Sequence, residues 1–243
     1  MDMFGAAYKA GHERVIVFVA DKDADQIVPA CPDWTVTDVV RHVTGISVDI
    51  TNLVFEGFAS DEWTDAQVSS RRNQSLGAVI EEWKASIDPA LDTFDRIDEL
   101  GVPDIVDSAM GPIPSKILVA TAVSDLLHHE FDIRNTYADT GSRDLLEVHM
   151  MAGGHVRSLR PLFAMRGLPA LRIESTDAGQ GWNIGTDEPV AVARATSFEI
   201  FRAIGGRRTR DEILAWEWEG DPMPFIDAMV LPHLAMRTES LGE

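Results

Sequence analysis

One stretch of the chain spaces ionisable side chains at helical intervals among apolar residues. Residues 117–134 read ILVATAVSDLLHHEFDIR. At about 100° per residue, Asp125, His129 and Asp132 fall on one side of a helix, within roughly 60° of one another. The opposite side is also apolar, which predicts a helix near the centre of its bundle. Because buried carboxylates and imidazoles are costly unless paired or metal-bound, this helix predicts an internal polar site.

A metal ion is the chemistry that this spacing suits. A carboxylate at 125 and an imidazole at 129 project side by side and can share one ion. Asp132 is placed to hold the other nitrogen of His129 and to fix the ring. His42 is the expected third ligand, because it replaces an apolar residue on the inward side that carries Val43. Two imidazoles and one carboxylate suit zinc first, and nickel or ferrous iron less well.

Simpler interpretations stay open at this point. An inward histidine such as His42 is more often a satisfied core residue, and an Asp-x-x-x-His pair is commonly only an ion pair. Their joint occurrence favours the metal hypothesis. His128 replaces His129 as ligand if the helix phase differs by one residue. Cys31 lies before a helix start, where thiolates are stabilised, but no histidine adjoins it in the sequence.

Helix follows helix through the first 167 residues. Apolar stripes predict helices over about 4–21, 35–55, 72–97, 115–137 and 144–166. Thr35 and Asp38 predict a capping box, Ser115 is the expected cap of the fourth helix, and Trp34 is expected to pack at a helix entry.

After Gly167 the pattern changes to short strands. These are expected at 171–175, 181–185 and 190–195, with short helices near 197–204, 209–215 and 223–236. We therefore predict an α+β fold, in which residues 1–167 form a helical bundle and residues 168–243 form a small α+β domain.

Composition and charge exclude several classes of protein. No apolar run approaches the ~20 residues needed to cross a bilayer, and no signal-peptide pattern opens the sequence. The single cysteine excludes an internal disulfide. These features indicate a cytoplasmic protein with no membrane partner. A net charge of −19 argues against a nucleic-acid partner.

Two motifs resemble a known family. Residues 28–42 read VPACPDWTVTDVVRH. They are similar to the entry of the second helix in mycothiol-dependent maleylpyruvate isomerase-like proteins of the DinB superfamily, roughly Pro-x-Cys-Pro-x-Trp-Thr-Val-x-Asp-x-x-x-His. The run from Asp125 through His129 to Asp132 is similar to the family's Glu-x-x-x-His-x-x-Asp. The resemblance implies a DinB-like bundle in which His42, Asp125 and His129 bind a divalent metal. Asp125 departs from the family's more usual glutamate.

The resemblance also implies an activity. The metal would activate mycothiol, a low-molecular-weight thiol cosubstrate, as a thiolate at neutral pH. The thiolate would attack a small electrophilic substrate such as maleylpyruvate, giving isomerisation or S-transfer. Arg207, which follows two glycines, is similar to an arginine of the family's C-terminal domain and would hold a substrate carboxylate. A solvated surface arginine is the alternative.

Two other functions stay open from the sequence. One is a metal-dependent hydrolase on the same bundle, which would use a metal-activated water. The other is a non-catalytic protein that binds a metal or a small ligand. A homodimer is compatible with each of these hypotheses.

Overall fold

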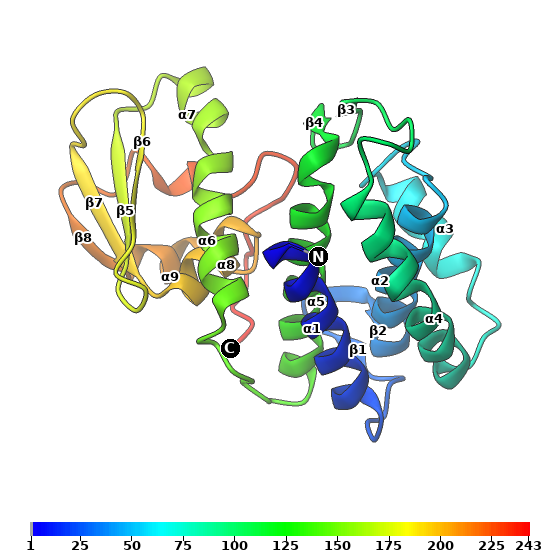
Figure 1. Ribbon diagram of the computed structural model, residues 1–243. Helices are drawn as coiled ribbons and strands as arrows, with labels where there is room; N and C mark the ends of the chain where they lie inside the picture. Colours follow the sequence, from blue (N-terminus) through cyan, green and yellow to red (C-terminus); the bar gives the residue numbers. More distant parts are fainter. Residues whose placement is uncertain (1) are drawn as a thin grey trace. The chain divides into compact units, whose positions relative to one another are not determined.

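Helices come first along the chain and a small sheet follows, as the sequence pattern predicts. The computed structural model describes residues 2–243 (Figure 1). Contacts divide the chain into two compact units, Met1–Asp139 and Thr140–Glu243. The fold class is α+β.

The boundary between the units differs from the one expected after residue 167. Helix α6 (Leu146–Ser158) packs against helix α8 (Ser197–Ile204) and strand β6 (Gly181–Ile184), so it belongs to the second unit. The apolar stripe of α6 is visible in the sequence. Periodicity alone does not tell which core that stripe covers, because it carries no information about the partner.

The first unit is a helical bundle. Helix α2 packs against α4, α1 packs against α5, and α2 also contacts α5. Its helices are α1 (Met3–Val19), α2 (Val36–Thr51), α3 (Asp61–Ser69), α4 (Leu76–Asp95) and α5 (Leu118–Thr136). The sequence stripes predict four of these helices. Helix α3 was not expected, because only three of its nine residues are buried.

Side-chain caps set the start of α2. Thr35 accepts from the Asp38 backbone N–H, and the Asp38 carboxylate accepts from the Thr35 backbone N–H, so the predicted capping box is confirmed. Ser115, the expected cap of α5, instead begins a 3₁₀ turn, η1 (Ser115–Ile117), and its hydroxyl donates to the Asp104 carbonyl. Helix α5 therefore begins at Leu118, two residues later than a Ser115 cap predicts.

A short hairpin leads into α2. Strand β1 (Ile27–Val28) pairs antiparallel with β2 (Cys31–Thr35), where the sequence suggests only turns. The pairing runs from Ile27 opposite Thr35 to Val28 opposite Cys31, so three residues of β2 bulge out between the two pairs. A second small hairpin joins β3 (Ile105–Val106) and β4 (Ile113–Pro114).

The second unit is a four-stranded mixed sheet with helices. The strand order is β6-β5-β7-β8, with β5 parallel to β7 and the other neighbours antiparallel. Burial alternates along the strands, as expected for a sheet with one covered face. Its remaining elements are α7 (Arg160–Arg166), β5 (Leu171–Ser175), β7 (Ala191–Ala195), α9 (Arg210–Leu214), β8 (Glu217–Glu219) and the 3₁₀ turn η2 (Ile226–Ala228).

One expectation for this unit is wrong, and one strand has no counterpart in the prediction. The helix expected near 223–236 is reduced to η2, because Pro224 and Pro232 cannot donate helical hydrogen bonds. Strand β8 was not expected, since its three residues give too short a pattern. The three strands predicted before it are confirmed to within a residue.

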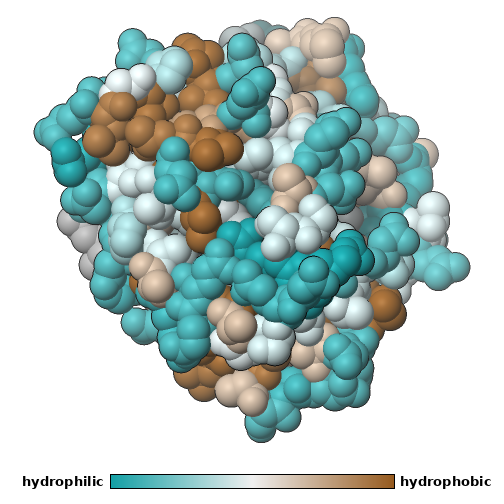
Figure 2. Space-filling view, turned by 90° about the vertical axis from the view of Figure 1, so that its right-hand side faces the viewer, coloured by the Kyte–Doolittle hydropathy of each residue, from teal (hydrophilic) through white to brown (hydrophobic). Residues whose placement is uncertain are grey.

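Polar side chains dominate the molecular face seen in Figure 2, where apolar ones gather in separate patches. Among residues 2–243, no helix has the length and apolar content that a membrane crossing requires.

His155 is a buried titratable group in the second unit. Its Nδ1–H donates to the Phe201 carbonyl at 3.3 Å, and its ring stacks on the Phe201 ring with centroids 5.0 Å apart. Burial lowers the pKa of His155 to about 4, with a further contribution from the charge of Arg207. The folded protein therefore keeps this imidazole neutral at a pH where the unfolded chain protonates it.

We expect the unfolding free energy to fall as the pH drops from about 6.5 to 4, by roughly 3 kcal/mol from His155. The unfolded state binds the extra proton over this range, so stability rises with pH. Urea unfolding of the wild type and of His155→Gln at pH 7 and pH 4.5 measures the effect. The variant should lose less stability on acidification; an equal loss would contradict the assignment.

Candidate metal centre

The structure brings the three predicted ligands together in the first unit. His42 comes from α2, and Asp125 and His129 come from α5. His42 Nε2 lies 3.4 Å from Asp125 Oδ2, and His129 Nε2 lies 3.7 Å from Asp125 Oδ1. The candidate ligand atoms all lie within 4.8 Å of one another. Both imidazoles are buried, whereas the Asp125 side chain is 34% exposed, so solvent reaches the group through the carboxylate.

The His42 ring is oriented by a relay that the sequence does not reveal. The Asp49 carboxylate accepts from Gln67 Nε2 at 2.7 Å, so the amide oxygen of Gln67 faces His42 Nδ1, at 2.8 Å. Because that oxygen can only accept, Nδ1 carries the proton and the Nε2 lone pair of neutral His42 faces Asp125. Gln67 lies on α3, a helix with no clear apolar stripe, and therefore gave no signal in the sequence.

Asp132 lies behind His129, as predicted. Its carboxylate is fully buried, and its Oδ2 is 3.3 Å from His129 Nδ1. Burial lowers the pKa of His129, but the charge of Asp125 and the contact with Asp132 outweigh it and raise the pKa to about 10. Two carboxylates that stabilise a proton on one imidazole would also stabilise a bound cation.

The donor set and its spacing fit a divalent ion. Ligand bonds of about 2.0–2.2 Å in a tetrahedral site place nitrogen and oxygen ligand atoms roughly 3.4 Å apart. The separations of 3.4 and 3.7 Å on the two sides of Asp125 match this within a few tenths of an ångström. Two histidines and a carboxylate leave a fourth position for a substrate or water. Three protein ligands and one open position are the arrangement found in catalytic zinc sites, whereas structural zinc sites have four protein ligands.

The phase of α5 selects one of two adjacent histidines. His129 belongs to the group with His42 and Asp125, whereas His128 is buried elsewhere on the helix. The alternative in which His128 takes the place of His129 is therefore not supported.

The β1–β2 hairpin brings two further side chains to the centre. The ring of Trp34 lies 5.2 Å from that of His42 and 6.2 Å from that of His129, between centroids. Trp34 therefore packs on the ligands as well as at the helix entry. Cys31 Sγ lies 4.0 Å from Asp132 Oδ2, although 101 positions separate them in the sequence. The ligand atoms of Cys31, His129 and Asp132 all lie within 4.8 Å of one another, so Cys31 has a histidine neighbour in space that the sequence does not show.

Arg207 lies in the second unit, directly after α8. Its Nη1 donates to the Gly205 carbonyl at 2.7 Å, and its backbone N–H donates to the Arg202 carbonyl at 2.8 Å. Gly206, with a φ of 75°, permits the turn between them. Its role toward a substrate stays a prediction.

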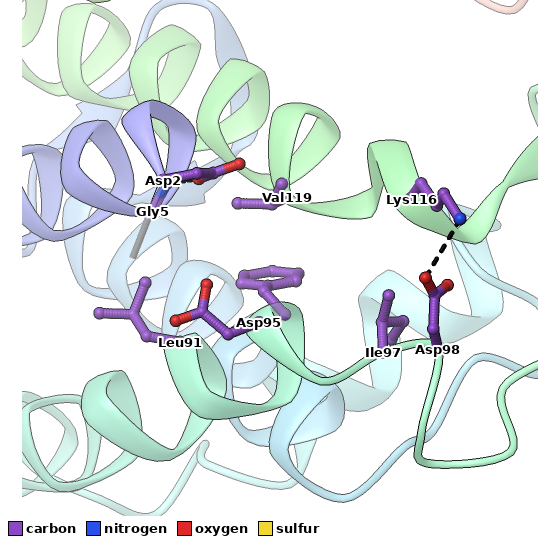
Figure 3. Close-up of a pocket in the computed structure, with 9 residues that line it drawn as sticks. Asp2, Gly5, Leu91, Asp95, Ile97, Asp98, Lys116 and Val119 are labelled. Carbon is purple, nitrogen blue, oxygen red and sulfur yellow. Dashed lines mark hydrogen bonds and ion pairs between the residues drawn. The ribbon is translucent and has the colours of Figure 1, made fainter.

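A separate hollow of about 200 Å³ in the first unit is lined by apolar side chains and by charged ones, among them Leu91, Val119, Asp2, Asp95, Asp98 and Lys116 (Figure 3). Three of these charged side chains have structural roles. Asp2 Oδ1 caps α1 by accepting from the Gly5 N–H, and Lys116 pairs with Asp98 at 3.1 Å. None of the candidate ligands lines this hollow.

Comparison with known proteins places the site in a family context. A family model described as the mycothiol maleylpyruvate isomerase N-terminal domain matches residues 8–134, the range that holds His42, Asp125, His129 and Asp132. The crystal structure of the mycothiol-dependent maleylpyruvate isomerase is similar in fold, with 13% identity and a TM-score of 0.57 over 85% of this chain and 92% of that one. A histidine-to-alanine mutant of that isomerase gives 12% identity with the same TM-score and coverage. No curated protein sequence matches this chain.

Close packing at Gly45 lets α3 approach α2 and so lets Gln67 reach His42. A Cβ at position 45 would lie 2.4 Å from Gln67 Cβ and 2.5 Å from its Cγ. Neither atom is the free end of a flexible chain, so an added methyl group must displace the helix.

We expect Gly45→Ala to destabilise the first unit by about 1–3 kcal/mol, because overpacking outweighs the better helix propensity of alanine. Urea unfolding measures this. Gly154→Ala in α6 is the matched control: a Cβ there meets nothing within 4 Å in the described chain, and it should stabilise by about 0.5–1 kcal/mol. A Gly45→Ala variant as stable as the wild type would contradict the close approach.

Proposed function

Because this chain belongs to the mycothiol maleylpyruvate isomerase N-terminal domain family, we propose that it is a metal-dependent enzyme that uses mycothiol as its thiol cosubstrate. Its substrate is a small electrophilic acid such as maleylpyruvate, and the reaction is an isomerisation or an S-transfer. The observation that carries the proposal is the convergence of His42 Nε2, His129 Nε2 and the Asp125 carboxylate. A soluble, cytoplasmic setting and small-molecule partners follow from this proposal.

His42, Asp125 and His129 would hold the divalent ion, with zinc as the first choice. Bound there, the ion would lower the pKa of a coordinated thiol and supply a thiolate at neutral pH. Asp125 is one methylene shorter than the family's glutamate. Its two oxygens nevertheless lie 3.4 and 3.7 Å from the two imidazoles, which supports a ligand role without a longer side chain.

The surrounding residues orient the ligands and limit access. Gln67 keeps the proton of His42 on Nδ1, and buried Asp132 faces the corresponding nitrogen of His129. The indole of Trp34 packs beside both imidazole rings and would limit access to the ligands from that side. Arg207 would hold the carboxylate of the substrate through a bidentate contact.

The first test is the metal content of the purified protein. We expect about one divalent ion per chain in the wild type and loss of that ion in His42→Ala and His129→Ala, because two donors hold an ion poorly. Elemental analysis measures the ratio. His128→Ala is the matched control and should keep the ion, since this buried neighbour lies outside the group.

Gln67→Ala provides a graded version of the same test. Loss of a group that orients a ligand costs about 10–100-fold in metal affinity, whereas Gln74→Ala, on the loop after α3, should cost nothing. Full occupancy in both histidine variants would overturn the site.

The second test is activity. The metal-loaded protein should convert maleylpyruvate only when mycothiol is present, and a chelator should abolish the turnover until zinc is restored. Turnover of an ester or amide without thiol would support the hydrolase alternative instead. Metal binding with no reaction on electrophilic probes would favour a non-catalytic binding protein.

A further inference from the structure

We propose that Cys31, His129 and Asp132 form a second metal site, specific for a thiophilic ion and in competition with the first for His129. The His129 ring has a carboxylate at each nitrogen: Asp125 lies 3.7 Å from Nε2, and Asp132 lies 3.3 Å from Nδ1. The proposed function uses only the Nε2 side. On the Nδ1 side the thiol of Cys31 completes a group of three metal-binding side chains.

The distances between the ligand atoms of Cys31, His129 and Asp132 are close to those around a tetrahedral metal ion. With bonds of about 2.3 Å to sulfur and 2.0–2.2 Å to nitrogen or oxygen, the ligand atoms around a tetrahedral ion lie roughly 3.4–3.6 Å apart. Here Nδ1 and Oδ2 are 3.3 Å apart and Sγ and Oδ2 are 4.0 Å apart, with all three atoms within 4.8 Å. The Cys31 sulfur, on a side chain that is only partly buried, would have to move by roughly 0.4–0.6 Å to reach these separations.

His129 Nδ1 has an unmet bonding capacity within the described residues. It is buried and, although it lies at ion-pair distance from Asp132, no acceptor meets hydrogen-bond geometry. Buried nitrogens without an aligned partner are costly, and coordination of a cation removes that cost. Asp132, fully buried beside it, supplies the compensating negative charge.

The two sites differ in chemical softness. The first offers two nitrogens and a carboxylate, whereas the second replaces one nitrogen with a thiolate and so prefers ions such as Cd²⁺ or Cu⁺. On binding, the Cys31 S–H proton and the proton on His129 Nδ1 both pass to solvent as the two metal bonds form, and the remaining ring proton of His129 stays on Nε2, which faces Asp125. A neutral imidazole has one acceptor nitrogen, so His129 serves one ion at a time. A thiophilic ion at Cys31 would therefore take a ligand from the first site and inhibit it.

Cadmium titration of the metal-free protein tests this proposal. The ultraviolet thiolate-to-cadmium charge-transfer band reports Cys31 alone, because the chain has one cysteine. We expect the band in the wild type and in His42→Ala, which lacks the first site, at one ion per chain. Cys31→Ser should show no band and still bind one Cd²⁺ through His42, Asp125 and His129. In Asp132→Asn, the Cd²⁺ affinity measured from this band should fall by at least about tenfold.

The outcomes separate the two sites. Absence of the band in both the wild type and His42→Ala would overturn the second site, and so would a band whose affinity is unchanged in Asp132→Asn. Two Cd²⁺ bound at once to the wild type would overturn the competition. Failure of Cys31→Ser to bind any Cd²⁺ counts against the first site only. Circular dichroism checks folding, and if Asp132→Asn does not fold, the comparison of His42→Ala with Cys31→Ser still decides.

Discussion

The cost of placing imidazoles and carboxylates out of water shapes the whole first unit. His129 is buried between two carboxylates, and each contact offsets part of the desolvation that burial imposes. Helix α5 must therefore lie where α2 can bring His42 to the same point. Helix α3 has few apolar residues of its own, but it packs closely enough against α2 for Gln67 to hydrogen-bond His42. The bundle therefore encloses a polar cluster within a largely apolar core.

The parts of this centre that lie on one helix can be predicted from the sequence. The spacing of Asp125, His129 and Asp132 follows from helix geometry, and the structure places all three as that geometry requires. His42 was identified because a polar residue interrupts an apolar stripe. The sheet of the second unit was predicted for a similar reason, since alternation along β5 and β7 is a local property.

What the sequence does not reveal depends on contacts between distant segments. Gln67 and Cys31 belong to no sequence pattern that predicts a role. Each becomes part of the site through a contact with a residue of another element, Gln67 with His42 and Cys31 with Asp132. The predicted unit boundary differs from the observed one for the same reason. The apolar stripe of α6 resembles those of the bundle helices, but α6 packs against α8 and β6. The helix expected near residue 230 fails because prolines outweigh an apolar pattern.

The bulge in β2 limits how this region can vary. Three residues lie between the pair Val28–Cys31 and the pair Ile27–Thr35, and Trp34 is one of them. The same short segment therefore holds an indole against two imidazoles, a thiol beside Asp132 and the cap of α2. Inserting or deleting one residue would move at least one of the three to the wrong side of the strand. Among relatives, we would therefore look for changes of residue type in this hairpin and for changes of length in other loops.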